Sequence, residues 1–249
     1  MRYLYITLGF ILAAGFSVSA STLVRTDGYS QMSLGKNNIL TNGLLNLYSF
    51  DAADVLSTTV YDRSGQGNNA TVTNRFSTTT TPYPGKIGQA FYFADSTEVF
   101  SNANSSITGT ASRTISIWTY QDTVIDSTAM ALGVPTAGNL FAILCYGGNW
   151  YFNGWSADLD TLVPCTTGEW HHSAVTYNGT MVTYFLDGAS IATSTIVLNT
   201  TAAPVKVGTS NGGVADWAGG LDDARVYNRV LSQAEITELY LISRPAVIR

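Results

Sequence analysis

Charged side chains are scarce in this sequence of 249 residues. Asp, Glu, Lys and Arg together make up 12% of it, about half the usual share in a soluble globular protein. The formal net charge is −5. A nucleic-acid-binding protein needs basic patches, and a membrane-surface segment needs a run of Lys and Arg. The sequence contains neither, so we expect no nucleic-acid partner.

Motifs for catalysis are also missing. A retaining glycosidase needs two carboxyl groups about 5–5.5 Å apart, and on one strand this requires acids at alternate positions. The only such pair is Asp158 and Asp160, in a stretch that we interpret as a loop or an edge. There is no Gly-x-Ser-x-Gly elbow, phosphate-binding loop or His-Glu-x-x-His motif. We therefore predict that the protein is not an enzyme.

Residues 1–20 have the pattern of a secretory signal peptide. Arg2 supplies a minimal positive region, Tyr3–Phe16 is apolar, and small residues lead up to Ala20. The apolar run is shorter than the roughly 20 residues that span a bilayer, which favours cleavage after Ala20 over a retained membrane anchor. We expect a protein that is secreted or held at the cell surface, with no membrane span after cleavage.

Cysteine and histidine occur only twice each. In an oxidising compartment Cys145 and Cys165 are expected to form a disulfide. An intervening strand would hold them too far apart, so the bond requires Cys165 to lie in a crossing loop. His171 and His172 are adjacent, and adjacent strand residues point to opposite faces. We therefore interpret them as strand histidines with satisfied hydrogen bonds rather than as a metal site.

The strongest fold signal lies between Glu169 and Ile191. Three β-rich runs are joined there by Asn178-Gly179 and Asp187-Gly188, dipeptides that tolerate the positive φ of a type I′ turn. Both faces of the first run are half apolar, which is typical of a strand covered on both sides. We predict a three-stranded antiparallel meander at the centre of an all-β domain.

Further strands and one helix are predicted on either side of this meander. More than ten short strands with turn signals between them indicate a sandwich or jelly roll. A capping box begins a short C-terminal helix at Ser232. We interpret residues 21–43 as a polar arm or linker, 44–240 as the domain, and 241–249 as an irregular tail. The predicted strands outside the meander include 44–50, 87–93, 114–120, 129–134, 140–146, 150–153, 204–207 and 221–227.

An ordered set of short motifs runs through the predicted domain. They are Tyr48-Ser-Phe50-Asp51, Asp62-Arg-Ser-Gly65-Gln-Gly67-Asn68, Pro84-Gly-Lys-Ile-Gly88-Gln-Ala-Phe91-Tyr-Phe93, Ile115-Ser-Ile-Trp118, Glu169-Trp-His-His172, Tyr184-Phe-Leu-Asp187-Gly188 and Gly220-Leu-Asp222-Asp-Ala-Arg225-Val-Tyr-Asn-Arg229. With them the chain resembles the laminin-G-like jelly-roll domain of the concanavalin A-like lectin/glucanase superfamily. The resemblance implies a two-sheet antiparallel sandwich of roughly a dozen strands. It does not fix a function.

The resemblance also implies a calcium ion, because many superfamily sandwiches hold one where the first and last strands meet. The matching acid is Asp222. Calcium takes six to eight oxygen ligands, and Asp51, Asp62 and Asn68 could supply others. The alternative is that these residues cap turns, with the acids paired to Arg63 or Arg225.

Aromatic residues gather where a sugar could bind. Aromatic faces pack against the apolar side of sugar rings, and short polar side chains flank them. The candidate cluster comprises Tyr146, Trp150, Tyr151, Asn153 and Trp155, with Trp217 as a second candidate. Large aromatic residues also fill cores, and strand alternation allows only one set to be exposed, either Trp150 with Phe152 or Tyr151 with Trp155.

Two classes of function remain open. The first is a secreted, non-catalytic binding module for an extracellular glycan or a protein ligand at a surface. The second is a structural subunit of an extracellular fibre, appendage or surface layer, whose partners are copies of itself. In the second class the arm at 21–43 and the tail at 241–249 could reach a neighbouring copy, as an added strand does.

Overall fold

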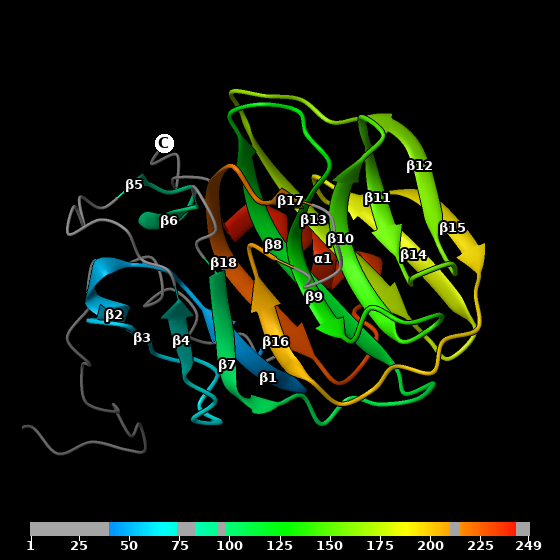
Figure 1. Ribbon diagram of the computed structural model, residues 1–249, viewed down its shortest axis with the longest axis horizontal. Coiled ribbons are helices and arrows are strands. Elements are labelled where there is room, and N and C mark those ends of the chain that lie inside the picture. The colour runs from blue at the N-terminus through cyan, green and yellow to red at the C-terminus, as the bar shows by residue number, and fades with distance from the viewer. Residues whose placement is uncertain (1–39, 74–82, 94–97, 210–214, 243–249) are drawn as a thin grey trace, which may run out of the picture.

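The computed structural model describes residues 40–73, 83–93, 98–209 and 215–242. The predicted signal peptide, most of the arm and most of the tail therefore lie outside the described residues. Strands form two sheets packed face to face, with sheet B in front and sheet A behind it in Figure 1. The predicted all-β, two-sheet jelly roll with one C-terminal helix is confirmed.

Sheet A has eight strands in the order β15-β14-β13-β8-β18-β6-β5, and β1 pairs with β18 beside this path. Every pairing in it is antiparallel. Its strands are β1 Leu44–Tyr48, β5 Tyr83–Pro84, β6 Gln89–Phe93, β8 Arg113–Gln121, β13 Trp170–Tyr177, β14 Met181–Leu186, β15 Ala189–Thr195 and β18 Gly219–Tyr227.

Sheet B has ten strands in the order β12-β11-β10-β9-β16-β7-β4-β3-β2, and β17 lies beside β9 in the sheet's one parallel pairing. Its strands are β2 Val55–Leu56, β3 Thr59–Val60, β4 Ala70–Thr73, β7 Glu98–Asn104, β9 Ser127–Gly133, β10 Leu140–Tyr146, β11 Asn149–Asn153, β12 Leu159–Pro164, β16 Pro204–Val207 and β17 Ala215–Asp216. A short 3-10 helix spans Ala52–Asp54.

The main core lies between the two sheets. Alternate residues of each strand point into it, such as Ile115 and Ile117 on β8 and Phe141 and Ile143 on β10. Their neighbours in sequence therefore point to the outer faces. The side chains that fill this space are almost fully buried, and Trp150 is among the largest of them.

Helix α1, Gln233–Ile242, covers part of the outer face of sheet A. The predicted capping box is present, because the Ser232 amide donates to Glu235 Oε2 over 2.7 Å and the Glu235 amide donates to Ser232 Oγ over 3.3 Å. The helix runs two residues into the stretch that we expected to be irregular, since Ile242 packs against the same apolar cluster as Leu40. No helix in the described part of the chain is long and apolar enough to cross a membrane.

The predicted meander is present as β13, β14 and β15, but it lies at one end of sheet A rather than at its centre. Asp187 and Gly188 have φ values of 50° and 81°, as the predicted type I′ turn requires. The other turn is shifted by one residue, because the Asn178 amide donates to the Met181 carbonyl over 3.2 Å. Asn178 Oδ1 accepts hydrogen bonds from the amides of Thr180 and Met181, and these local bonds select the shifted turn.

The predicted disulfide joins Cys145 to Cys165, with Cα atoms 6.2 Å apart. Cys165 lies just after the end of β12, and its amide donates to the carbonyl of Gly148 in the β10–β11 turn over 2.8 Å. No strand separates the two cysteines there, as the sequence required. The stretch with Asp158 and Asp160, which we interpreted as a loop or an edge, lies at the start of β12, the edge strand of sheet B.

Candidate functional site

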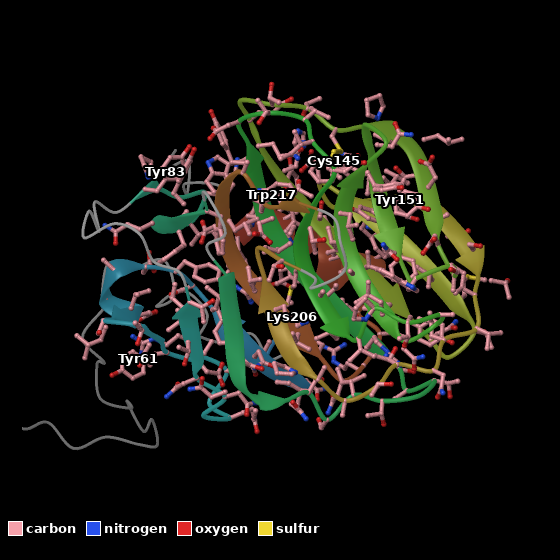
Figure 2. All side chains as sticks on the ribbon, viewed as in Figure 1. Tyr61, Tyr83, Cys145, Tyr151, Lys206 and Trp217 are labelled. Carbon is pink, nitrogen blue, oxygen red and sulfur yellow. A yellow bond between two sulfur atoms is a disulfide. The ribbon has the colours of Figure 1, made fainter. Side chains whose placement is uncertain are left out.

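The outer face of sheet B carries a small apolar cluster formed by Ala131, Leu140, Ala142 and Leu144. These residues alternate with β9 and β10 side chains that point into the main core. Tyr151 on β11 and Trp155 in the following turn pack against the cluster and remain partly exposed. Figure 2 shows Tyr151 on β11, next to the edge strand β12 of this sheet. One aromatic set of the sequence candidates therefore faces outward.

Tyr146 extends this outward set at the end of β10. Its side chain is 43% exposed, and its ring centroid lies 5.2 Å from that of Tyr151 at an interplanar angle of 54°. Asn153 Oδ1 accepts a hydrogen bond from the Trp155 amide over 2.6 Å, which holds the turn that places Trp155. We name Tyr146, Tyr151, Asn153 and Trp155 the β11 surface.

Two carboxylates border the β11 surface. Asp158 Oδ1 accepts from the Gly154 amide over 2.9 Å, and Asp160 Oδ1 accepts from Asn149 Nδ2 over 3.0 Å. Burial, followed by the charge of Asp158 and a hydrogen bond to it, raises the pKa of Tyr151 to about 12. The Tyr151 hydroxyl therefore stays protonated at neutral pH. Aromatic faces, a phenol, amides and bound carboxylates can recognise hydroxyl-rich ligands, and they hold no nucleophile activated by a base.

Two of the aromatic candidates are core residues instead. Trp150 and Trp217 are each 1% exposed, so neither can contact a ligand in this structure. Trp150 points between the sheets because it alternates with Tyr151 on β11. The Trp217 indole nitrogen donates to the Tyr120 carbonyl over 3.2 Å. The glycine-rich loop before β18 therefore anchors a core side chain.

The four predicted calcium ligands fall into two separate groups. Asp222 is fully buried, and its Oδ2 accepts from the Ile87 amide over 2.8 Å. Its Oδ1 has no hydrogen-bond partner. Burial first, and then the carboxylates of Asp223 and Asp51, raise the pKa of Asp222 well above its usual value. Asp51 lies near enough to contribute to this shift, and its Oδ1 accepts from the Gln89 amide over 2.7 Å.

Asp62 and Asn68 form the second group, in a turn of their own. Asp62 Oδ1 accepts from the amides of Leu47 and Ser64, and its Oδ2 accepts from the Asn68 amide over 2.9 Å. These contacts match the turn-capping alternative for Asp62 and leave it poorly placed as a metal ligand. No group of three or more His, Cys, Asp and Glu side chains that could hold a metal occurs among residues 40–242 outside the gaps.

The arginines also pair differently from the alternative that the sequence left open. Arg63 forms an ion pair with Asp54. Arg225 Nη2 lies 2.7 Å from Asp223 Oδ2, and both side chains are buried. The acids in these two ion pairs, Asp54 and Asp223, are not among the four predicted ligands.

A family model described as the concanavalin A-like lectin/glucanases superfamily matches residues 93–237. The chain belongs to this superfamily. No curated protein sequence matches it. The concanavalin A-like chain is also similar to many solved structures, and all of those compared below are under 25% identical. Their likeness therefore concerns the fold alone.

Three solved domains illustrate this likeness. Domain 4 of AbnA, an extracellular GH43 arabinanase from Geobacillus stearothermophilus solved with arabinotriose, has a TM-score of 0.66 at 21% identity, covering 79% of this chain and 98% of that one. The binding domain of Paraclostridial Mosquitocidal Protein 1 has a TM-score of 0.62 at 18% identity, covering 81% and 52%. The binding domain of Botulinum neurotoxin DC, solved with rat synaptotagmin II, has a TM-score of 0.59 at 10% identity, covering 82% and 52%. The chain thus spans about half the length of the two toxin domains.

The two histidines of this concanavalin A-like sandwich point to opposite sides of β13, as expected. Both ring nitrogens of His171 have hydrogen-bond partners, whereas the buried Nδ1 of His172 has none, so the expectation of satisfied hydrogen bonds holds only for His171. His171 Nδ1 lies 2.8 Å from Asp187 Oδ2, and its Nε2 lies 2.7 Å from Thr166 Oγ1. His172 Nε2 lies 2.7 Å from Ser116 Oγ. The hydrogen bond with Asp187 raises the pKa of His171. Burial, followed by the charge of Arg225, lowers the pKa of His172 to about 3.

A second aromatic group lies on sheet A and was not predicted from the sequence. It contains Tyr83, Tyr92, Tyr120 and Trp170 from four different strands. Only the strand order of the superfamily sandwich brings these residues together, because they are up to 87 positions apart (170 − 83). In the sequence these four residues are isolated aromatic positions in separate strands. Such positions do not show which strands pair, so the group could not be predicted.

Proposed function

We propose that the protein is a secreted, non-catalytic module that binds an extracellular carbohydrate through the β11 surface. The tilted, partly exposed pair of Tyr146 and Tyr151 carries this proposal. Partly exposed Trp155 and Asn153 lie beside the pair. Rings that are left open on a sheet face beside short polar side chains suit the apolar and hydroxyl faces of a sugar. The arabinotriose complex of a similar fold supports this class of ligand.

The carboxylates beside this surface support binding rather than hydrolysis. Asp160 Oδ1 accepts from the Leu162 amide over 2.8 Å as well as from Asn149. Asp158 Oδ1 accepts from the Gly154 amide over 2.9 Å. Both acids therefore hold the local backbone and its neighbours. A glycosidase would instead present one free nucleophile and one protonated acid to the sugar.

Removing two of the three outward aromatic rings is expected to weaken glycan binding at least about 30-fold, because truncated binding hot spots cost about 2 kcal/mol or more. The double variant Tyr151→Ala and Trp155→Ala tests this by affinity electrophoresis in gels that contain arabinan, xylan, mannan or β-glucan. Tyr61→Ala is the matched control, since Tyr61 is 37% exposed and Figure 2 shows it at the opposite end of the molecule from Tyr151. Wild-type protein that is not retarded in any of the four gels would rule out the proposal.

A self-assembling subunit is the second candidate, and the edge of sheet A favours it. β15 is a seven-residue edge strand whose side chains are exposed or partly exposed and are mostly Ala, Ser and Thr. An unpaired edge can accept a strand from another copy. Sedimentation velocity over a hundredfold range of concentration separates the candidates, because a binding module stays monomeric and a subunit forms polymers.

We also propose that a structural calcium ion binds between Asp222 and Asp51. The buried Asp222 Oδ1, which has no hydrogen-bond partner, supports this site, because a hard cation would satisfy it and favour the ionised carboxylate. Calcium at 100 times its dissociation constant should stabilise the fold by about 2.7 kcal/mol and raise Tm by about 5–10 °C. Thermal melts in calcium and in chelator measure this difference. Asp222→Asn should abolish the difference, and equal melts of the wild type would contradict the site.

A further inference from the structure

The aromatic residues on sheet A form a continuous row across adjacent strands. Tyr92 on β6 is the cross-strand partner of Gly220 on β18, Gly220 is the partner of Tyr120 on β8, and Tyr120 is the partner of Trp170 on β13. Cross-strand partners share a face of the sheet. Their sequence neighbours Phe91, Phe93 and Leu221 belong to the main core, so the row faces outward. We name Tyr83, Tyr92, Tyr120 and Trp170 the sheet A row.

Gly220 shapes the middle of the sheet A row. A Cβ atom at this position would lie 2.8 Å from Trp170 Cη2 and 2.9 Å from Tyr83 Cε1. The missing side chain lets both rings lie low over the strand. Ring centroids are 5.1 Å apart for Tyr83 and Tyr92, 6.2 Å for Tyr83 and Tyr120, and 5.6 Å for Tyr120 and Trp170. The rings therefore form one tilted platform instead of separate exposed residues.

Polar groups border this platform. The Tyr92 hydroxyl donates to Asp122 Oδ2. Burial, and then the nearby Tyr120 hydroxyl and Asp122 carboxylate, raise the pKa of Tyr83. The Tyr83 ring also lies against the rings of Tyr92 and Tyr120, so its phenol belongs to the same platform. Lys86 Nζ lies 5.0 Å from the centre of the Trp118 ring, in the next row of the same face. Asp122 is thus bonded to a ring of the row, and Lys86 lies in the neighbouring row of the same face.

We propose that the sheet A row is a second carbohydrate-binding surface, which takes a neutral glycan and makes the module bivalent. This inference rests on the proposed function of the β11 surface. Aromatic rings match the apolar face of a sugar, and the phenols and Asp122 match its hydroxyl groups. The row itself presents uncharged aromatic and phenolic groups, which favours a neutral ligand. Binding at both surfaces of one chain raises the avidity for a long polysaccharide and cross-links its strands.

The available area favours a glycan over a second copy of the chain. A stable protein interface needs about 800 Å² from each partner. Three of the four rings in the row are only partly exposed, and Tyr92 is 42% exposed. The next row of the face is closed, because Tyr240 of α1 stacks on Trp118 with centroids 5.7 Å apart. A few neighbouring sugar units fit such a strip, whereas a folded partner finds little apolar surface there.

The test measures stoichiometry and cross-linking together. The four polysaccharide gels identify the glycan that retards the wild-type protein, and a short oligosaccharide of that glycan is then titrated calorimetrically. We expect two oligosaccharides per wild-type chain, one per chain for Tyr92→Ala and Trp170→Ala, and one for the β11 surface double variant. Mixtures of wild-type protein with the long polysaccharide should become turbid, and either class of variant should lose the turbidity. Tyr92→Ala changes an exposed side chain and guards against misfolding of Trp170→Ala.

Each other outcome overturns one of the two ideas or both. If both row variants keep the wild-type stoichiometry and the β11 surface variant loses binding, the proposed site on the sheet A row is wrong and the proposed function of the β11 surface stands. If only the row variants lose binding, the sheet A row is the binding site and the proposed role of the β11 surface is wrong. No retardation of the wild-type protein would remove both. A wild-type dimer that dissociates in Tyr92→Ala without glycan present would assign the row to self-association instead.

Discussion

Replacing both cysteines with alanine, Cys145→Ala and Cys165→Ala, is expected to lower the free energy of unfolding by about 3 kcal/mol. The disulfide closes a segment with a sequence separation of 20, and the chain-entropy model assigns about 3 kcal/mol to a loop of that length. For a domain of this size the loss lowers Tm by roughly 6–12 °C. Urea unfolding followed by circular dichroism measures the change. Alanine avoids placing a hydroxyl group at Cys145, which is fully buried.

Chemical reduction supplies the control for this prediction. Wild-type protein in reducing buffer should match the double variant, and the variant itself should not respond to the reductant. The β10–β11 turn should be the first region to exchange its amide hydrogens after reduction, because Cys165 holds it through both the disulfide and the bond to Gly148. Equal urea midpoints for oxidised and reduced wild type would show that the bond does not stabilise the fold.

Acid is expected to destabilise the protein through His172. Its folded-state pKa is about 3 because burial, followed by the charge of Arg225, disfavours the protonated ring. The unfolded chain binds the same proton near pH 6.5. Stability from this residue is therefore complete above pH 6.5 and falls as pH drops toward 3, by about 3 kcal/mol at pH 4.5. His172→Gln keeps a partner for Ser116 and removes the titration, so its unfolding free energy should fall less between pH 7 and pH 4.5.

The neighbouring histidine provides a matched control of opposite sign. The hydrogen bond with Asp187 raises the pKa of His171, so its contribution is complete below pH 6.5 and is lost as pH rises through the raised value. His171→Gln should therefore alter the neutral-to-alkaline limb of the stability curve and leave the acid limb of His172 in place. Parallel acid limbs for wild type and His172→Gln would contradict the assignment.

Local features of the fold could be predicted wherever neighbouring residues decide the structure. The capping box at Ser232 starts α1, and Asp187-Gly188 forms the expected turn. The turn at Asn178 was misjudged because the Asn178 side chain accepts from the amides of Thr180 and Met181 and moves the turn by one residue. The place of the meander within sheet A depends on pairings between distant strands. No local pattern encodes that order, so its predicted central position was wrong.

The candidate site shows the same division. The alternation of side chains along β11 correctly placed Trp150 and Tyr151 on opposite faces of the strand. It could not show which of the two faces the other sheet covers. Asp222 and Asp51 accept from the nearby amides of Ile87 and Gln89, whereas Asp62 finds amide donors within its own turn. The sheet A row stayed hidden because Tyr92, Tyr120 and Trp170 meet only through the pairing of β6, β18, β8 and β13.

The pairing of the first strand with the last one has a mechanical consequence. Leu44 at the start of β1 is the partner of Tyr227 at the end of β18, and the Asn228 amide donates to the Gly43 carbonyl over 2.9 Å. β1 therefore begins at the corner of the sandwich where β18 ends. Tension applied between Leu44 and Tyr227 would peel β1 from β18 one hydrogen bond at a time rather than shear the two strands. The pair should hence separate at low force once α1, which follows β18 and packs on sheet A, has been pulled away.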